Sequence, residues 1–158
     1  MNIKELHIGT SAPDASLTNE QGTSTRLSDL WKQGGLVIVF YPGDQTPGCT
    51  IQLCAFRDDW EKFRELGLSI VGVNHGNSDS HKQFSEKHHF PFPLLVDAQK
   101  RVAKLYGSVY SFLGFTLIRR MVVGIDRDGT VRYIRHGMPR HADILKALKP
   151  YAINTKTS

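Results

Sequence analysis

The chain has 158 residues, of which 40% are hydrophobic and 22% charged, and its formal net charge at pH 7 is +5. That length and balance are typical of one soluble globular domain large enough to bury a core. The basic residues are spread along the chain and mostly stand beside acidic ones. A nucleic-acid interface needs a concentrated basic patch with aromatic platforms, so we expect no nucleic-acid partner. No stretch is long and apolar enough to span a bilayer, so we expect no membrane partner either.

The beginning of the chain carries no apolar run of signal-peptide length, which favours a cytoplasmic location. Internal repeats, low-complexity tracts and interdomain linkers are absent from the sequence. We therefore expect a single domain over residues 1–150, followed by a flexible C-terminal tail over residues 151–158.

The first half of the chain predicts a hairpin, a short helix and a buried strand. Residues 14–27 alternate around Glu20-Gln21-Gly22, a pattern typical of a short hairpin. A helical turn is expected at residues 28–31. The continuous apolar run 36–41 is rich in β-branched residues and ends at Pro42, which indicates a strand buried on both faces.

The remainder alternates between helices and strands. A helix is expected from about residue 49 to residue 66, because Leu53, Phe56, Trp60 and Phe63 form an apolar stripe at helical spacing. The other expected elements are strands at 68–73, 121–125 and 130–135, the last two joined by the turn 126–129, and helices at 78–88, 99–106 and 141–148. This order predicts a three-layer α/β domain with a mixed central sheet flanked by helices, and it is similar to a thioredoxin-like fold.

Cysteine usage is the most informative feature of the composition. The chain has only two cysteines, Cys49 and Cys54, five residues apart. A disulfide scaffold would use more cysteines and wider loops, and a structural zinc site would need further Cys or His ligands at finger-like spacing. Two close cysteines without such partners indicate redox activity.

Cys49 is predicted to lie in the first turn of a helix. Thr46 is a favourable N-cap residue and Pro47 suits the first helical position, so Cys49 becomes the third. The free backbone N–H groups and the positive end of the helix dipole there favour a thiolate over a thiol. Because only the thiolate is a nucleophile, we expect Cys49 to be reactive.

Cys54 lies one and a half helical turns further on. In an intact helix, residues i and i+5 have Cα atoms about 8.7 Å apart. A disulfide requires a Cα separation of roughly 4.4–6.8 Å. A permanent disulfide is therefore not expected, whereas a transient one could form if the helix start unwinds, which Gly48 and the proline-containing approach would ease.

The stretch Pro42-x-x-x-Thr46-x-x-Cys49, with Pro47-Gly48-Cys49-Thr50 and Cys54 on the same helix, resembles the peroxiredoxins, specifically the bacterioferritin-comigratory or Q-type subgroup. The likeness extends from about residue 9 to residue 148. It implies that Cys49 is the peroxidatic cysteine and Cys54 the resolving one. It further implies that Thr46 hydrogen-bonds the peroxide and the thiolate, and that Pro42 shields the pocket from water.

The resemblance also implies an arginine beside the thiolate, and counting back from the turn 126–129 gives Arg120. Arg119 would point to the opposite face of a strand, so Arg120 is favoured without excluding its neighbour. Gln52 takes the place of a family residue that orients this arginine. The implied reaction reduces hydrogen peroxide or organic hydroperoxides through a sulfenic acid and a Cys49–Cys54 disulfide, and a thioredoxin-type dithiol resets the enzyme. No cofactor is expected; a monomer is favoured, and a dimer stays open.

Several alternatives remain at this point. Cys54 could be a buried apolar residue, in which case an outside thiol would resolve the sulfenic acid. A thioredoxin-fold copper carrier would pair the two cysteines with a distant histidine such as His136, and a protein disulfide oxidoreductase would call for a Cys-x-x-Cys motif that is missing. His81, His88 and His89 are expected to be solvated or structural. The aromatic segment 106–115 could cover the pocket, form a dimer contact or fill the core.

Overall fold

The computed structural model describes residues 5–152. Seven strands form one mixed sheet in the order β2-β1-β5-β4-β3-β8-β9, and β6 and β7 form a separate hairpin. The strands are β1 (Ser16–Thr18), β2 (Ser24–Arg26), β3 (Leu36–Phe40), β4 (Ser69–Asn74), β5 (Leu94–Val96), β6 (Val109–Phe112), β7 (Phe115–Ile118), β8 (Met121–Ile125) and β9 (Val131–His136). The helices are α1 (Leu27–Trp31), α2 (Pro47–Asp58), α3 (Trp60–Glu65), α4 (Ser78–His88), α5 (Arg101–Tyr106), α6 (His141–Leu148) and the 3₁₀ turn η1 (Lys149–Tyr151).

Strand β3 lies at the centre of the sheet. All five of its residues are buried, as the apolar, β-branched sequence requires. It pairs in parallel with β4, where Val39 faces Gly72, and antiparallel with β8, where Val39 faces Val122. A strand held from both sides fixes the position of the loop that leaves its carboxyl end.

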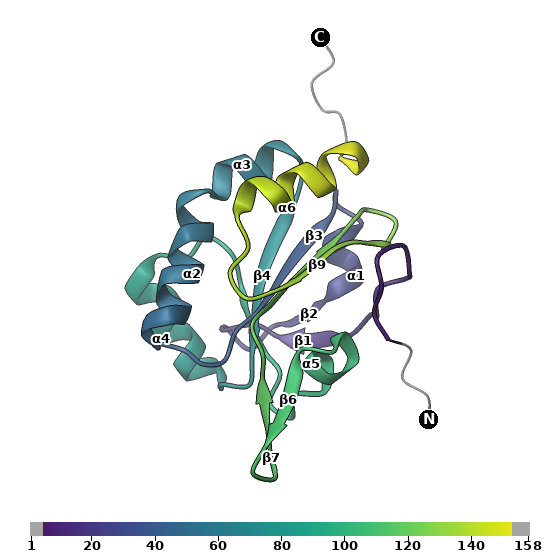
Figure 1. The fold of residues 1–158 in the computed structure, drawn as a ribbon. Coiled ribbons are helices and arrows are strands. Elements are labelled where there is room, and N and C mark those ends of the chain that lie inside the picture. The colour runs from purple at the N-terminus through teal and green to yellow at the C-terminus, as the bar shows by residue number, and fades with distance from the viewer. Residues whose placement is uncertain (1–4, 153–158) are drawn as a thin grey trace.

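Helices cover both faces of this sheet, so the fold has three layers (Figure 1). On one face, buried residues of α2, α3, α4 and α6 pack with the β3 side chains that point to that face, and together they form one apolar cluster. On the other face, α1 and α5 pack against the opposite side chains of the same strand. The predicted three-layer α/β, thioredoxin-like architecture is thus confirmed. Within residues 5–152, no helix combines the length and the apolar character that crossing a membrane requires.

Most predicted elements are present, but two of the predicted helices differ in extent. The single helix predicted over residues 49–66 is divided into α2 and α3, because Asp59 leaves the helical conformation (φ −97°, ψ 9°). The Asp59 carboxylate lies 2.6 Å from Nδ1 of His141 and 3.3 Å from Nζ of Lys62. The helix predicted to start at residue 99 begins only at Arg101, because Lys100 is left-handed (φ 57°).

The sequence did not predict β5 or the β6–β7 hairpin. The hairpin contains most of the aromatic segment and projects from the body of the molecule (Figure 1). At the C-terminal end, the guanidinium of Arg132 stacks 3.9 Å from the ring centroid of Tyr151. The remainder of the predicted tail, residues 153–158, lies outside the described residues.

A buried polar network holds the loop between β3 and α2. The Asp44 side chain, only 4% exposed, accepts hydrogen bonds from the Tyr41 hydroxyl (2.6 Å) and the Ser80 hydroxyl (2.7 Å). Nδ1 of His81 lies 2.5 Å from the same carboxylate, and its Nε2 lies 3.0 Å from the carbonyl oxygen of Leu95. The network ties the loop to α4 and β5.

These contacts shift the pKa values of Asp44 and Tyr41. Burial acts to raise the pKa of Asp44, but hydrogen bonds from His81, Tyr41 and Ser80 hold that pKa below its ordinary value. Burial and the neighbouring Asp44 raise the pKa of Tyr41 well above its ordinary value, so its hydroxyl stays a donor. A carboxylate with a depressed pKa stabilises the fold above its unfolded-state pKa, and this contribution is lost as the pH falls through the folded-state value.

Replacing Asp44 with asparagine should therefore destabilise the fold. The substitution leaves two or three buried donors without a carboxylate, so we expect the free energy of unfolding at pH 7 to fall by about 2–4 kcal/mol. Urea denaturation followed by circular dichroism measures this difference. As the pH falls from the ordinary carboxyl pKa of 3.8 through the lower folded-state pKa of Asp44, the two proteins should converge in stability because the native carboxylate becomes protonated.

Asp58→Asn provides the matched control, because the Asp58 side chain is 67% exposed and paired only with Arg57 across the surface. Its effect should stay within about 0.5 kcal/mol. Equal stabilities of the two variants would show that the Asp44 network does not anchor the loop.

Candidate active site

Cys49 occupies the third position of α2, as predicted. The helix begins at Pro47 directly after the loop from β3, so its amino end faces the carboxyl end of the central strand. Ligand sites of open α/β sheets gather at this edge. The Cys49 side chain is fully buried in the apolar cluster under α2.

The first turn of α2 offers two backbone donors near this sulfur. The N–H of Thr50 already donates to the carbonyl of Thr46 at 2.9 Å, and Pro47 has no N–H. The N–H groups of Gly48 and Cys49 lie too close to the start of the helix to donate to a carbonyl within it. Both are therefore available to another acceptor. Together with the helix dipole they provide positive potential where a thiolate would lie.

Thr46 and Pro42 lie in the loop before the helix. Thr46 is the N-cap residue, as predicted, but its hydroxyl does not cap the helix; it donates to the carbonyl of Gly43 at 3.0 Å. Its oxygen lone pairs remain free to accept. Pro42 is exposed at the start of the loop.

Arg120 lies against the first turn of α2. A Cβ atom at Gly48 would come within 2.6 Å of Nη2 of Arg120, so the guanidinium occupies the space that glycine leaves open. Arg120 is half-buried, whereas Arg119 is exposed and only its backbone N–H is engaged, with the carbonyl of Ser108. Of the two candidate arginines, the structure therefore brings Arg120 against Gly48, the residue before Cys49.

Gln52 fixes the position of this guanidinium. Nη1 of Arg120 donates to Oε1 of Gln52 at 3.0 Å, and Nε2 of Gln52 donates to the carbonyl of Gly137 at 3.3 Å. The N–H of Gly137 returns to the carbonyl of Arg120 at 3.1 Å. The predicted contact between Gln52 and Arg120 is confirmed. Gly137 completes a ring of three hydrogen bonds with these two residues, and nothing in the sequence indicated its part.

Cys54 lies on the same helix, half-buried against the apolar cluster. Both cysteines are free thiols, and the helix is continuous between them. In this conformation the two Cα atoms are about 8.7 Å apart by helical geometry, beyond the reach of a disulfide. A bond between them needs the start of α2 to unwind.

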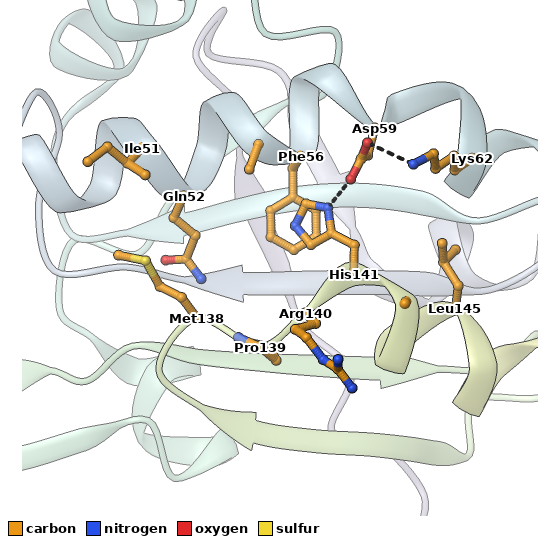
Figure 2. Close-up of a pocket in the computed structure, with 12 residues that line it drawn as sticks. Ile51, Gln52, Phe56, Asp59, Lys62, Met138, Pro139, Arg140, His141 and Leu145 are labelled. Carbon is orange, nitrogen blue, oxygen red and sulfur yellow. Dashed lines mark hydrogen bonds and ion pairs between the residues drawn. The ribbon is translucent and has the colours of Figure 1, made fainter.

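An apolar cavity of about 560 Å³ borders the site between α2 and α6 (Figure 2). Gln52 lines one end beside Met138, and His141 and Asp59, joined by a hydrogen bond, line another part. Neither cysteine lines this cavity, so it neighbours the Arg120–Gln52 pair rather than enclosing the sulfur.

Three of the histidines considered in the sequence have surroundings of their own. His136 ends β9 and is exposed, His81 is part of the Asp44 network, and His88 contacts Phe84 and Phe90 through its ring. Among residues 5–152, no group of three or more His, Cys, Asp or Glu side chains is arranged to hold a metal ion.

Comparison with known proteins gives consistent matches. The model of the AhpC/TSA family matches residues 8–134. Chloroplastic peroxiredoxin Q from Oryza sativa subsp. japonica is 40% identical over 126 residues, which cover 80% of this chain but only 57% of the rice protein. The chain therefore spans little more than half the length of that relative.

Solved structures agree with this match. The peroxidoxin BcpB of Mycobacterium tuberculosis superimposes with a TM-score of 0.86 at 35% identity, covering 92% of this chain and 98% of that one. The bacterioferritin comigratory protein of Xanthomonas campestris gives a TM-score of 0.80 at 30% identity, covering 94% and 98%. On these grounds the chain belongs to the AhpC/TSA family and, within it, to the Q-type or bacterioferritin-comigratory peroxiredoxins.

Proposed function

We propose that this chain is a thiol-dependent peroxidase in which Cys49 attacks the peroxide and Cys54 resolves the product. The observation that carries the proposal is the position of Cys49, buried in the first turn of α2 with the Arg120 guanidinium held over Gly48. A cation, two backbone N–H groups and a nearby hydroxyl suit a reaction in which negative charge moves from sulfur to oxygen.

In the first step the Cys49 thiolate attacks one peroxide oxygen, an S–O bond forms and the O–O bond breaks. The leaving alkoxide or hydroxide takes a proton to give an alcohol or water, and Cys49 becomes a sulfenic acid. Arg120 and the N–H groups of Gly48 and Cys49 stabilise the charge on the leaving oxygen, and Thr46 orients the peroxide through its hydroxyl. Pro42 limits the entry of water from the loop side.

In the second step the Cys54 thiolate attacks the sulfur of the Cys49 sulfenic acid. An S–S bond forms, the S–O bond breaks and the departing hydroxide leaves as water. An external dithiol, of the thioredoxin type, then reduces the disulfide by thiol–disulfide exchange. Because both thiols come from one helix, a monomer completes the cycle, and a reducing compartment such as the cytoplasm would supply the dithiol.

The substrates we propose are hydrogen peroxide and organic hydroperoxides. The Xanthomonas campestris relative is described as having alkyl peroxide reduction activity. The half-buried guanidinium and the apolar surroundings of Cys49 suit peroxides that carry an apolar group.

The two cysteines should play different roles when the reduced protein receives one equivalent of hydrogen peroxide. We expect the native chain to lose both thiols and about two mass units. The Cys54→Ser variant should stop at the sulfenic acid, so that its mass increases by one oxygen atom. Cys49→Ser should not react faster than a free thiol. Thiol titration and intact mass spectrometry measure both quantities. Rapid oxidation of the Cys49→Ser variant would refute the assignment, and a native chain that accumulates sulfenic acid would make Cys54 a non-resolving residue.

Gly48→Ala should separate reactivity from stability. The added methyl group displaces the flexible end of Arg120, while alanine is a better helix former than glycine. We expect the rate of Cys49 oxidation to fall by about tenfold or more with no loss of thermal stability. Arg119→Ala is the matched control, since its exposed side chain lies away from the site. Equal rates for Gly48→Ala and the native chain, measured by stopped-flow, would remove Arg120 from the mechanism.

Oxidation should unwind the start of α2. Because the Cα distance in the helix exceeds what a disulfide allows, we expect the backbone N–H groups of residues 50–54 to lose at least about tenfold of their hydrogen-exchange protection in the oxidised protein. Residues of β3 should keep theirs. Cys54→Ser, treated with the same peroxide, should retain the protection in α2. Unchanged exchange in an oxidised native chain would exclude a disulfide within this helix.

A further inference from the structure

The β6–β7 hairpin presents an apolar face to solvent. The register pairs Tyr110 with Leu117 and Phe112 with Phe115, and directly paired residues lie on the same face of a hairpin. These four side chains are 36–70% exposed. On the opposite face, Val109 and Ile118 pack against the core of the domain. The hairpin thus turns its larger apolar side chains outward, where they have no partner in the described part of the chain.

The tip of the hairpin carries an apolar residue where turn chemistry favours a polar one. Leu113 and Gly114 are the two turn residues, and both have positive φ angles (49° and 82°). Such turns favour Asn-Gly or Asp-Gly, because a bulky side chain is strained in the left-handed conformation. Leu113 is nevertheless 80% exposed. With so much of the side chain exposed, little packing within the described part of the domain offsets the unfavourable backbone conformation.

The flanks of the hairpin are basic. Between Asp97 and Asp126 the chain has no acidic residue. The same stretch has five basic residues, which are Lys100, Arg101, Lys104, Arg119 and Arg120. Their combined charge of +5 equals the formal net charge of the whole chain. Nζ of Lys100 donates to the carbonyl of Thr116 at 2.6 Å, which ties α5 to β7. Arg101, Lys104 and Arg119 are exposed. The apolar tip therefore stands on a base of uncompensated positive charge.

The hairpin leaves the domain at the edge that holds the active site. Met121, which opens β8, pairs with Phe40 at the carboxyl end of β3, and β7 ends only two residues before Arg120. Figure 1 shows the hairpin extending beyond that edge of the sheet. A surface that receives the hairpin would face the loop that leads to Cys49.

We propose that the β6–β7 hairpin docks the protein on an anionic lipid surface, with Leu113, Phe112 and Phe115 entering the interface. The hairpin has an apolar tip, Tyr110 further from the tip, and exposed cations at its base. This order matches a membrane surface, where acyl chains lie beneath an interfacial layer and anionic headgroups. A second copy of this chain would cover the same apolar face, but it would bring two sets of like charges together, so charge complementarity favours the lipid. The absence of a spanning segment, on which the expectation of no membrane partner rests, does not bear on docking at the surface.

Docking would bring the site to hydroperoxides formed on lipid acyl chains. This substrate class rests on the proposed peroxidase function, whereas docking itself requires no catalysis. The two are therefore tested by separate measurements.

The docking test is flotation of the reduced full-length chain with vesicles of phosphatidylcholine alone or mixed with phosphatidylglycerol. We expect binding to the mixed vesicles, weakened by added salt. Leu113→Asn should reduce the fraction bound by roughly tenfold, since it removes the apolar tip while suiting the turn, so that a folding defect is not the cause. Ile8→Asn, which replaces an aliphatic residue 63% exposed elsewhere on the surface, is the matched control and should bind like the native chain.

Lack of binding to mixed vesicles, or equal losses for both variants, would overturn the proposal. So would a concentration-dependent dimer in sedimentation velocity that Leu113→Asn abolishes while vesicle binding is absent, since it would assign the face to a second copy. In the activity arm, Leu113→Asn should slow the consumption of phosphatidylcholine hydroperoxide in mixed vesicles but not that of hydrogen peroxide. Vesicle binding without consumption of either peroxide would contradict the peroxidase function and leave docking supported.

Discussion

The structure depends on a buried thiol in the first turn of the helix that follows the central strand. Cys49 is fully buried in an apolar cluster, where an uncompensated negative charge would cost several kcal/mol. In the proposed reaction, compensation would come from backbone N–H groups, the helix dipole and the guanidinium of Arg120, and each of these depends on geometry set elsewhere. The central strand β3 places the amino end of α2, and the absence of a side chain at Gly48 lets the guanidinium approach. Gln52 then fixes the cation through its contacts with Arg120 and Gly137.

The proposed cycle requires the same helix start to be both ordered and able to open. An ordered first turn presents its free N–H groups, whereas the proposed disulfide with Cys54 demands that the first turns of α2 unwind. Two local features lower the cost of opening: Thr46 makes no side-chain cap, and glycine at position 48 adds no helix propensity. The break at Asp59, where His141 and Lys62 hold the carboxylate, separates α2 from α3, so unwinding at one end need not disturb the packing of α3. The rearrangement that the proposed cycle requires is thereby confined to a single short helix.

Local patterns predicted the elements that place the site, and contacts between distant segments escaped them. The β-branched run of β3, the Thr46-Pro47 helix start and the turn 126–129 are signals contained within a few residues, and each is present. Arg120 could be located only by counting from that turn in the light of the family resemblance, because no local pattern distinguishes it from Arg119. The Asp44 network joins side chains from the loop and α4 to a backbone carbonyl of β5, groups that are far apart in sequence, so no spacing rule reveals it. The division of the helix at Asp59 was missed for a similar reason, since the apolar stripe continues across the break.

The hairpin shows how the same kind of reasoning works on a surface. The number of charges gave no indication of a patch while the chain was considered as a whole, because acidic residues elsewhere neutralise most of the basic ones. Folding places the longest acid-free stretch of the chain around an apolar hairpin and beside the carboxyl end of β3. A strained leucine at the tip would be replaced readily if only the turn mattered, since asparagine suits that conformation better. Its presence together with the charge and the position makes an external contact the simplest physical account of this part of the chain.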